Sequence, residues 1–348
     1  MKLACTLPAC ALMLFSFAGA KAQTTASKVV TAANSFLSTL DENQKHSALF
    51  AYDDEQQRKR WSNLPTTMVA RGSLPLKDMT PAQRTAAMAL LAAALSPRGF
   101  EKVQQIMEGD EVLKTGEGNG RGGRGGRGGG AMFGKDLYYL AILGTPSERS
   151  PWMVQFGGHH LALNVTIAGE QGVLTPTLTG AQPALYTING KTVRPLGQES
   201  DKAMALLNSL DESQRKQAIL NYRVADLVLG PGQDGKTIQP EGLKASGMNE
   251  KQKAMLLDVI GEWAGIVQEK AAAARMAELK ADLNETWFAW SGNTSVAPGS
   301  NITAYYRIQG PHLVIEYSPQ QLGGDPSLHV HTMYRDPTND YGRKPGAR

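Results

Sequence analysis

The chain has 348 residues, of which 36 are basic and 32 are acidic, and it contains two cysteines. This small positive charge does not indicate nucleic acid or an anionic membrane surface as a partner. Both cysteines, Cys5 and Cys10, lie in an N-terminal segment that we expect to be removed. Disulfide bonds, zinc–thiolate sites and cysteine nucleophiles are therefore excluded from the mature protein.

Residues 1–22 have the pattern of a secretory signal peptide. Lys2 supplies the positive start, residues 3–17 are apolar, and Ala20-Lys21-Ala22 is an A-x-A cleavage site. Cleavage after Ala22 removes two lysines and lowers the formal net charge from +4 to +2. The predicted location is periplasmic or extracellular. No later segment has the roughly 20 uninterrupted apolar residues of a transmembrane helix, so no such segment is predicted.

In residues 23–195, helical patterns precede strand patterns. Apolar spacing and the capping residues Asp41 and Thr80 predict helices over residues 27–40, 41–61, 80–95 and 100–107. Alternating or continuous apolar runs predict strands over residues 137–143, 152–156, 160–168 and 173–178. Between the two groups, residues 116–130 form a glycine- and arginine-rich segment, which we interpret as a flexible loop and not as a nucleic-acid-binding tail.

Residues 196–348 repeat this order. Helices are predicted over residues 200–210, 211–220 and 249–283, and strands over residues 286–291, 302–309, 313–317 and 328–334. Helices grouped before strands that are joined by short turns indicate an α+β fold with antiparallel sheets.

Two pairs of segments resemble one another across the chain. Residues 36–45 match residues 206–215, and residues 156–164 match residues 308–316, which aligns His160 with His312. We therefore expect an internal duplication, with two related halves, 23–195 and 196–348, that share one continuous structure around a pseudo-two-fold axis.

Five of the six histidines lie in the strand regions. His329 and His331 are separated by one residue, so a regular strand directs both rings to the same face, about 7 Å apart. One of the adjacent residues His159 and His160 could complete a site for a divalent metal ion, with zinc, iron and copper all suited to imidazole ligands. We prefer His159, since the alignment of His160 with His312 favours a structural role for that pair. The alternative is that the histidines are ordinary hydrogen-bonded strand residues.

The polar tail that follows the His-x-His strand is a second candidate. Arg335 could hold an anionic group of a substrate through two hydrogen bonds. Asp336 or Asp340 could act as a general base or as a further metal ligand. The alternative is a well-bonded chain terminus that holds the last strand in place.

Two segments carry a resemblance to a known family. They are QFGGHHLALN, residues 155–164, and HVHTMYRDPTNDYG, residues 329–342. On these motifs the chain resembles the bacterial and fungal proteins grouped as domain of unknown function 3500, over about residues 28–342. The resemblance implies an exported protein and brings no assigned activity.

The histidines and the polar tail together predict an exported, metal-dependent enzyme, most simply a hydrolase. In this hypothesis the metal ion activates water, Arg335 orients the substrate, and Asp336 or Asp340 moves the proton. The alternatives are a non-catalytic protein that binds a small molecule or carbohydrate, and a structural protein of the cell envelope.

Overall fold

The computed structural model describes residues 24–116, 132–322 and 324–344. The predicted signal peptide and nearly all of the glycine- and arginine-rich segment lie outside these residues. The helices of the described part are α1 Thr25–Ser38, α2 Glu42–Ala48, α3 Glu55–Arg58, α4 Pro81–Ala94, α5 Pro97–Thr115, α6 Gly197–Ser209, α7 Glu212–Ala218, α8 Glu250–Ala264 and α9 Glu269–Ala281. The strands are β1 Leu49–Phe50, β2 Leu74–Pro75, β3 Tyr139–Leu143, β4 Trp152–Gly158, β5 Leu161–Ala168, β6 Gln171–Val173, β7 Thr177–Ala181, β8 Tyr186–Ile188, β9 Lys191–Val193, β10 Leu243–Lys244, β11 Trp287–Ser291, β12 Tyr305–Gly310, β13 Leu313–Pro319 and β14 Val330–Arg335.

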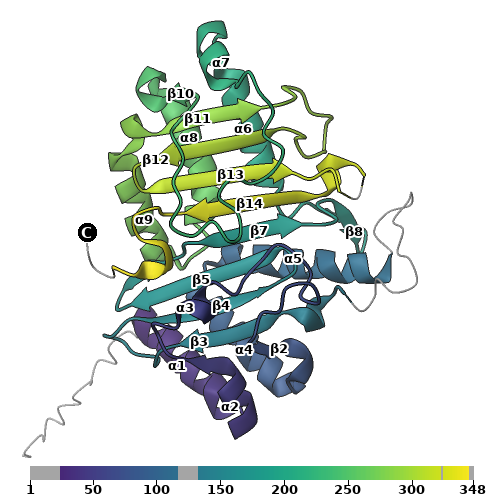
Figure 1. The fold of residues 1–348 in the computed structure, drawn as a ribbon, viewed down its shortest axis with the longest axis vertical. Helices are drawn as coiled ribbons and strands as arrows, with labels where there is room; N and C mark the ends of the chain where they lie inside the picture. The colour runs from purple at the N-terminus through teal and green to yellow at the C-terminus, as the bar shows by residue number, and fades with distance from the viewer. Residues whose placement is uncertain (1–23, 117–131, 323, 345–348) are drawn as a thin grey trace, which may run out of the picture.

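One large sheet runs through the molecule (Figure 1). Its strand order is β1-β3-β4-β5-β7-β14-β13-β12-β11-β10, and β2 and β6 pair with β3 and β5. All neighbours are antiparallel except β1 and β3, which are parallel. The α+β class predicted from the sequence is confirmed, with a mixed sheet in place of a purely antiparallel one.

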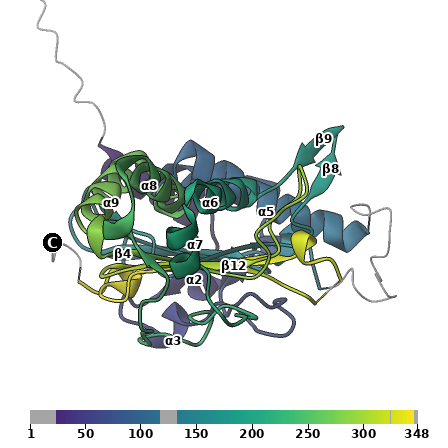
Figure 2. The same ribbon diagram turned by 90° about the horizontal axis from the view of Figure 1, so that it is seen from above.

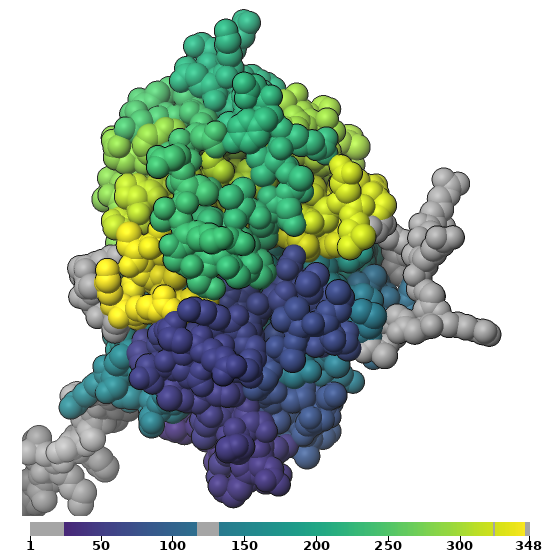
Figure 3. All heavy atoms as spheres, viewed as in Figure 1, coloured from purple at the N-terminus to yellow at the C-terminus, as the bar shows by residue number. Residues whose placement is uncertain are grey.

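The two faces of this sheet have different coverings. Helices α5, α6, α8 and α9 lie on one side of the sheet, and α3 lies on the other (Figure 2). Two segments, residues 51–73 and residues 219–242, cover the second face and meet over its centre (Figure 3). We call them the first and second cover segments. Within the described ranges, no helix is both long enough and apolar enough to cross a membrane.

Strand β14 shows how alternation separates the two faces. The hydroxyl of Thr332 faces the helices and accepts a hydrogen bond from the Trp263 indole at 3.0 Å. The next residue, Met333, packs on the opposite face against Trp61 of the first cover segment. His331 and Arg335 share this second face, because strand side chains alternate with a period of two.

Two short helices begin with the same capping arrangement. Asp41 and Asp211 each form a capping box with the glutamine three residues later. These glutamines, Gln44 and Gln214, also exchange side-chain hydrogen bonds of 2.8–3.2 Å with a glutamine in the first turn of α4 and α8, respectively. The predicted helix starts at residues 41 and 211 are therefore confirmed.

Three predicted helices are wrong in length. The helix expected over residues 100–107 is α5, which runs from Pro97 to Thr115. The helix expected over residues 41–61 ends at Ala48, because the chain then pairs with β3 as strand β1. The helix expected over residues 249–283 is interrupted between α8 and α9. There the main chain of Ile266 and Gln268 forms hydrogen bonds of 2.9 and 3.1 Å with residues 94 and 96. Both interruptions are caused by backbone hydrogen bonds to segments distant in sequence, which cannot be predicted from the spacing of apolar residues.

The close approach of α5 to this interruption requires a glycine. A Cβ atom at Gly99 would lie 2.2 Å from the carbonyl oxygen of Ile266, whereas one at Gly109, in the same helix, would meet no atom closer than 3.4 Å.

We expect Gly99→Ala to lower the free energy of unfolding by about 1–3 kcal/mol through overpacking. Gly109→Ala, the matched control, should be neutral or raise it by up to about 1 kcal/mol, because alanine favours helix. Urea unfolding of both variants measures the difference, and equal stabilities would contradict the close contact.

Candidate metal centre

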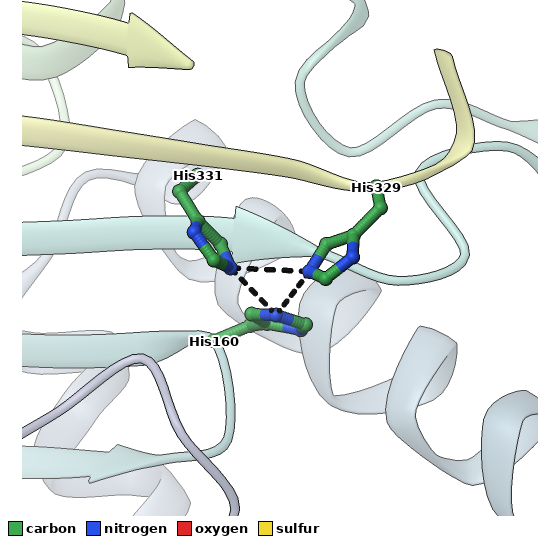
Figure 4. Close-up of side chains that lie close together, drawn as sticks. All are labelled: His160, His329 and His331. Carbon is green, nitrogen blue, oxygen red and sulfur yellow. Dashed lines mark hydrogen bonds between the residues drawn. The ribbon is translucent and has the colours of Figure 1, made fainter. Parts of the chain in front are cut away.

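Three imidazole rings meet at one point on the second face of the sheet. His329 directly precedes β14, His331 lies on β14, and His160 lies in the turn between β4 and β5 (Figure 4). The Nε2 atom of His160 lies 3.0 Å from the Nε2 atoms of His329 and His331, and those two atoms are 3.1 Å apart. The three nitrogens therefore form a nearly equilateral triangle.

Local structure explains why His160 takes part. Gly158 and Leu161 form the last pair of the β4–β5 hairpin, so His159 and His160 make a two-residue turn and not the regular strand that we expected. His160 has a φ of 59°. This left-handed conformation is uncommon for residues other than glycine and is often a feature of functional turns.

A glycine on β7 makes room for the His160 ring between β5 and β14. A Cβ atom at Gly180 would lie 3.2 Å from Cδ2 of His160 and 2.9 Å from the carbonyl oxygen of Val330. Gly180 also donates a backbone hydrogen bond of 2.7 Å to the carbonyl of His160. Because Gly180 pairs with His331 in the register of β7 and β14, the turn is held level with that ring.

The three rings are buried and uncharged. His160, His331 and His329 are 2, 5 and 6% exposed. Burial lowers the pKa of all three rings: that of His160 well below its usual value, that of His329 to about 4, and that of His331 below its usual value. At neutral pH they are therefore in the form that coordinates metal ions.

The second nitrogen of each ring has a different environment. His329 Nδ1 donates to the carbonyl of Leu322 at 2.7 Å, which leaves the Nε2 lone pair directed into the triangle. His331 Nδ1 lies 3.2 Å from the amide nitrogen of Asn63, in the first cover segment, and 3.9 Å from the carboxylate of Asp226, in the second. His160 Nδ1 is buried and has no hydrogen-bond partner within the described part of the chain.

Hydrogen bonding among the rings cannot satisfy this triangle. A neutral imidazole has one N–H group, and that of His329 is already committed to a carbonyl. Hydrogen bonds can join at most two of the three edges, so one edge would leave two nitrogens in contact without a bond. Unsatisfied buried nitrogens are costly, whereas a cation at the centre would accept all three lone pairs.

The spacing also fits a metal ion. Zinc–nitrogen bonds of about 2.0–2.1 Å in tetrahedral geometry separate the ligand nitrogens by roughly 3.3–3.4 Å. The observed separations of 3.0–3.1 Å are shorter by only a few tenths of an ångström. His160, His329 and His331 can therefore hold a divalent ion with small side-chain adjustments.

His159 lies beside this group and is not one of the three. Its Nδ1 atom lies 2.6 Å from a carboxylate oxygen of Asp110, and its ring contacts that of His160 at a tilt of 35°, with centroids 3.6 Å apart. Asp110, His159 and His160 also offer ligand atoms within 4.8 Å of one another. The Nδ1 atom of His159 is already paired with the Asp110 carboxylate, so we interpret Asp110 and His159 as a buried hydrogen-bonded pair. Burial raises the pKa of Asp110, and the neighbouring His159 opposes that shift.

The predicted polar tail forms a network of its own. Arg335 lies four residues beyond His331 on the same face, roughly 13 Å along the strand. Its guanidinium binds Asp234 and Asp340, at 3.2 and 2.7 Å, and two carbonyl groups of the second cover segment. Asp336 pairs with Arg275 at 3.1 Å, on the helix side. Arg335, Asp336 and Asp340 thus pair with charged groups of the tail, the second cover segment and α9, and not with the three imidazoles.

His312 is likewise remote from the triangle. It is partly exposed, and its ring contacts Thr338 at 2.9 Å and Asp282 at 3.8 Å. Sequence reasoning did not find Asn63, Asp226 or Gly180, which support the ligands. None of these three residues carries a local pattern, because each belongs to a segment that reaches the site only through tertiary structure.

Arg335 is expected to stabilise the fold without affecting metal binding. Arg335→Ala leaves the partly buried Asp340 without its cation and should lower the free energy of unfolding by about 3–5 kcal/mol. Arg343→Ala, the matched control in the same tail, removes an exposed pair with Glu55 and should cost at most about 1 kcal/mol. Chemical unfolding and metal content of both variants are the measurements. Loss of metal from a stably folded Arg335→Ala protein would place the tail in the site after all.

Comparison with known proteins gives the family of the chain and no activity. No curated protein and no solved structure matches it. A family model described as "Protein of unknown function (DUF3500)" matches residues 22–343. The chain therefore belongs to the DUF3500 family.

Proposed function

We propose that this protein is a metal-dependent enzyme, most simply a hydrolase, whose divalent ion is bound by His160, His329 and His331. The observation that carries the proposal is the triangle of three buried, uncharged Nε2 atoms, 3.0–3.1 Å apart. Zinc, iron and copper all suit three imidazoles, and the ligand set does not choose among them.

Three protein ligands match the usual composition of catalytic zinc sites, which leave one position open. An ion in such a site supplies Lewis-acid activation of water. The residues of this chain hold the ligands in place: Leu322 fixes the orientation of His329, while Asn63 and Asp226 face the outer nitrogen of His331. The proposal gives no step to Arg335, Asp336 or Asp340.

Asp226 supplies a carboxylate beside the outer nitrogen of His331. Its side chain is 58% exposed and lies 3.9 Å from His331 Nδ1. Although burial acts to raise its pKa, the neighbouring His331 ring and hydrogen bonds from the Leu227 amide and Gln320 lower it overall. Asp226 is therefore an ionised, solvent-exposed carboxylate next to His331, which we propose as a metal ligand.

The first test is metal content and hydrolysis in protein purified without an affinity tag. We expect about one divalent ion per chain, and hydrolysis of a panel of chromogenic esters and amides that follows metal occupancy. His160→Ala, His329→Ala and His331→Ala should each lose both. His312→Ala and His46→Ala, which remove partly or fully exposed rings, serve as controls and should keep both.

Two results would contradict this proposal at different levels. Protein that remains metal-free after incubation with zinc, iron and copper ions would overturn the metal centre itself. A stoichiometric ion without hydrolysis of any probe would leave the metal centre standing and refute the hydrolase assignment.

The second test concerns the residue behind the ligand. Asp226→Asn keeps the shape of the side chain and removes its charge, and it should weaken metal affinity about 10–100-fold, as the loss of carboxylates that support histidine ligands does elsewhere. Asp258→Asn, at an exposed ion pair with Lys202, is the matched control. Competition with a chromogenic chelator measures both affinities, and equal values would exclude a role for Asp226.

A second candidate function is non-catalytic binding of a small molecule. It is favoured by a cavity on the helix side of β14, which is described below.

Export to the periplasm or medium remains part of the proposal, and the family match beginning at residue 22, beside the predicted cleavage after Ala22, supports it.

We also infer that the chain arose by internal duplication. The sheet order is symmetric about the β7–β14 pair, which supports this inference. So do the paired capping boxes at Asp41 and Asp211. In addition, hairpins β4–β5 and β12–β13 each close with a two-residue turn, at residues 159–160 and 311–312.

A further inference from the structure

A cavity of about 250 Å³ lies on the helix side of the sheet, away from the three histidines. Helix α9, the β5–β6 hairpin, the side chain of Tyr334 and the turn after β14 enclose it. Tyr334 and His331 lie on opposite faces of β14, since they are three residues apart on an extended strand. The cavity is therefore separate from the metal centre.

The walls of this cavity are mainly apolar. Val173, Leu174, Val267 and Ala271 line its interior, and Ala274 lines it from the exposed surface of α9. Pockets that bind small molecules typically combine such walls with a few polar groups that fix the orientation of the ligand. The volume lies just below the range usual for drug-sized ligands, so a smaller molecule is the better fit.

The charges around the cavity favour an anionic head group. Glu170 pairs with Lys270 at 3.0 Å, and Arg275 pairs with both Glu278 and Asp336, at 3.0 and 3.1 Å. Each lining carboxylate thus already has a cation.

Lys344 is a lining cation that has no such carboxylate partner within the described ranges. The ammonium group of Lys344 forms no ion pair with any residue of the described ranges, although it lines the same cavity. An added carboxylate would meet this free positive charge, whereas an added amine would meet no free carboxylate.

We propose that this cavity binds a small amphipathic carboxylate, with an unbranched hydrocarbon chain inside it and the carboxylate at Lys344. The site is independent of the proposed metal chemistry, and neither requires the other. Octanoate is the probe, since it joins a flexible apolar chain to a single negative head group.

The test is isothermal titration calorimetry of the full-length protein with octanoate. We expect saturable binding, at least tenfold weaker in Ala274→Phe, where the new ring fills the cavity. Ala273→Phe is the matched control, because Ala273 is also exposed on α9 and does not line the cavity. Lys344→Glu should weaken binding several-fold, while Lys280→Glu, at an exposed position on α9 that does not line the cavity, should not.

The wild-type protein also provides a test that needs no variant. Octanol and octylamine share the hydrocarbon chain, and both should bind more weakly than octanoate. Absence of saturable octanoate binding at millimolar concentration would overturn the proposal. Equal weakening by Ala273→Phe and Ala274→Phe, or equal affinity for octylamine and octanoate, would overturn it as well. None of these results bears on metal content.

Discussion

The pairing of β7 with β14 is the constraint on which the rest of the structure depends. It joins the two halves of the sheet at its centre through five residue pairs, from Thr177 to Ala181 on β7. Its register also places His331 opposite Gly180. Gly180 in turn binds the carbonyl of His160, so the same register brings the β4–β5 turn beside His331. A shift of this register by one residue would move His331 to the helix side, since strand side chains alternate. Fold and candidate site therefore depend on the same backbone hydrogen bonds.

The parts of this site that follow from strand geometry could be predicted from the sequence. The spacing of His329 and His331 predicts two rings on one face, and the structure brings both into the triangle. The choice between His159 and His160 could not be made in this way, because strand alternation does not apply to a two-residue turn with a left-handed residue. Asn63 and Asp226 were missed because they reach His331 from cover segments whose course is set by long-range contacts.

A similar division holds for the fold. Capping residues such as Asp41 and Asp211 act within one turn of a helix, so the helix starts could be predicted from local sequence. The break between α8 and α9 depends on backbone bonds from Ile266 and Gln268 to a segment far away in sequence. The polar tail illustrates the same limit: its residue types suggest a site, but the nearby acids and carbonyls that occupy Arg335 become visible only in three dimensions.

The location of the three imidazoles has a consequence for biogenesis. His160 is synthesised 169 residues before His329 and 171 residues before His331. A nascent or truncated polypeptide that lacks β14 therefore offers one of the three donors and cannot chelate an ion tightly. Under the proposed metal binding, capture of the ion would require that β14 has docked beside β7. Bound metal would then distinguish molecules with the assembled sheet from those in which β14 is still unpaired.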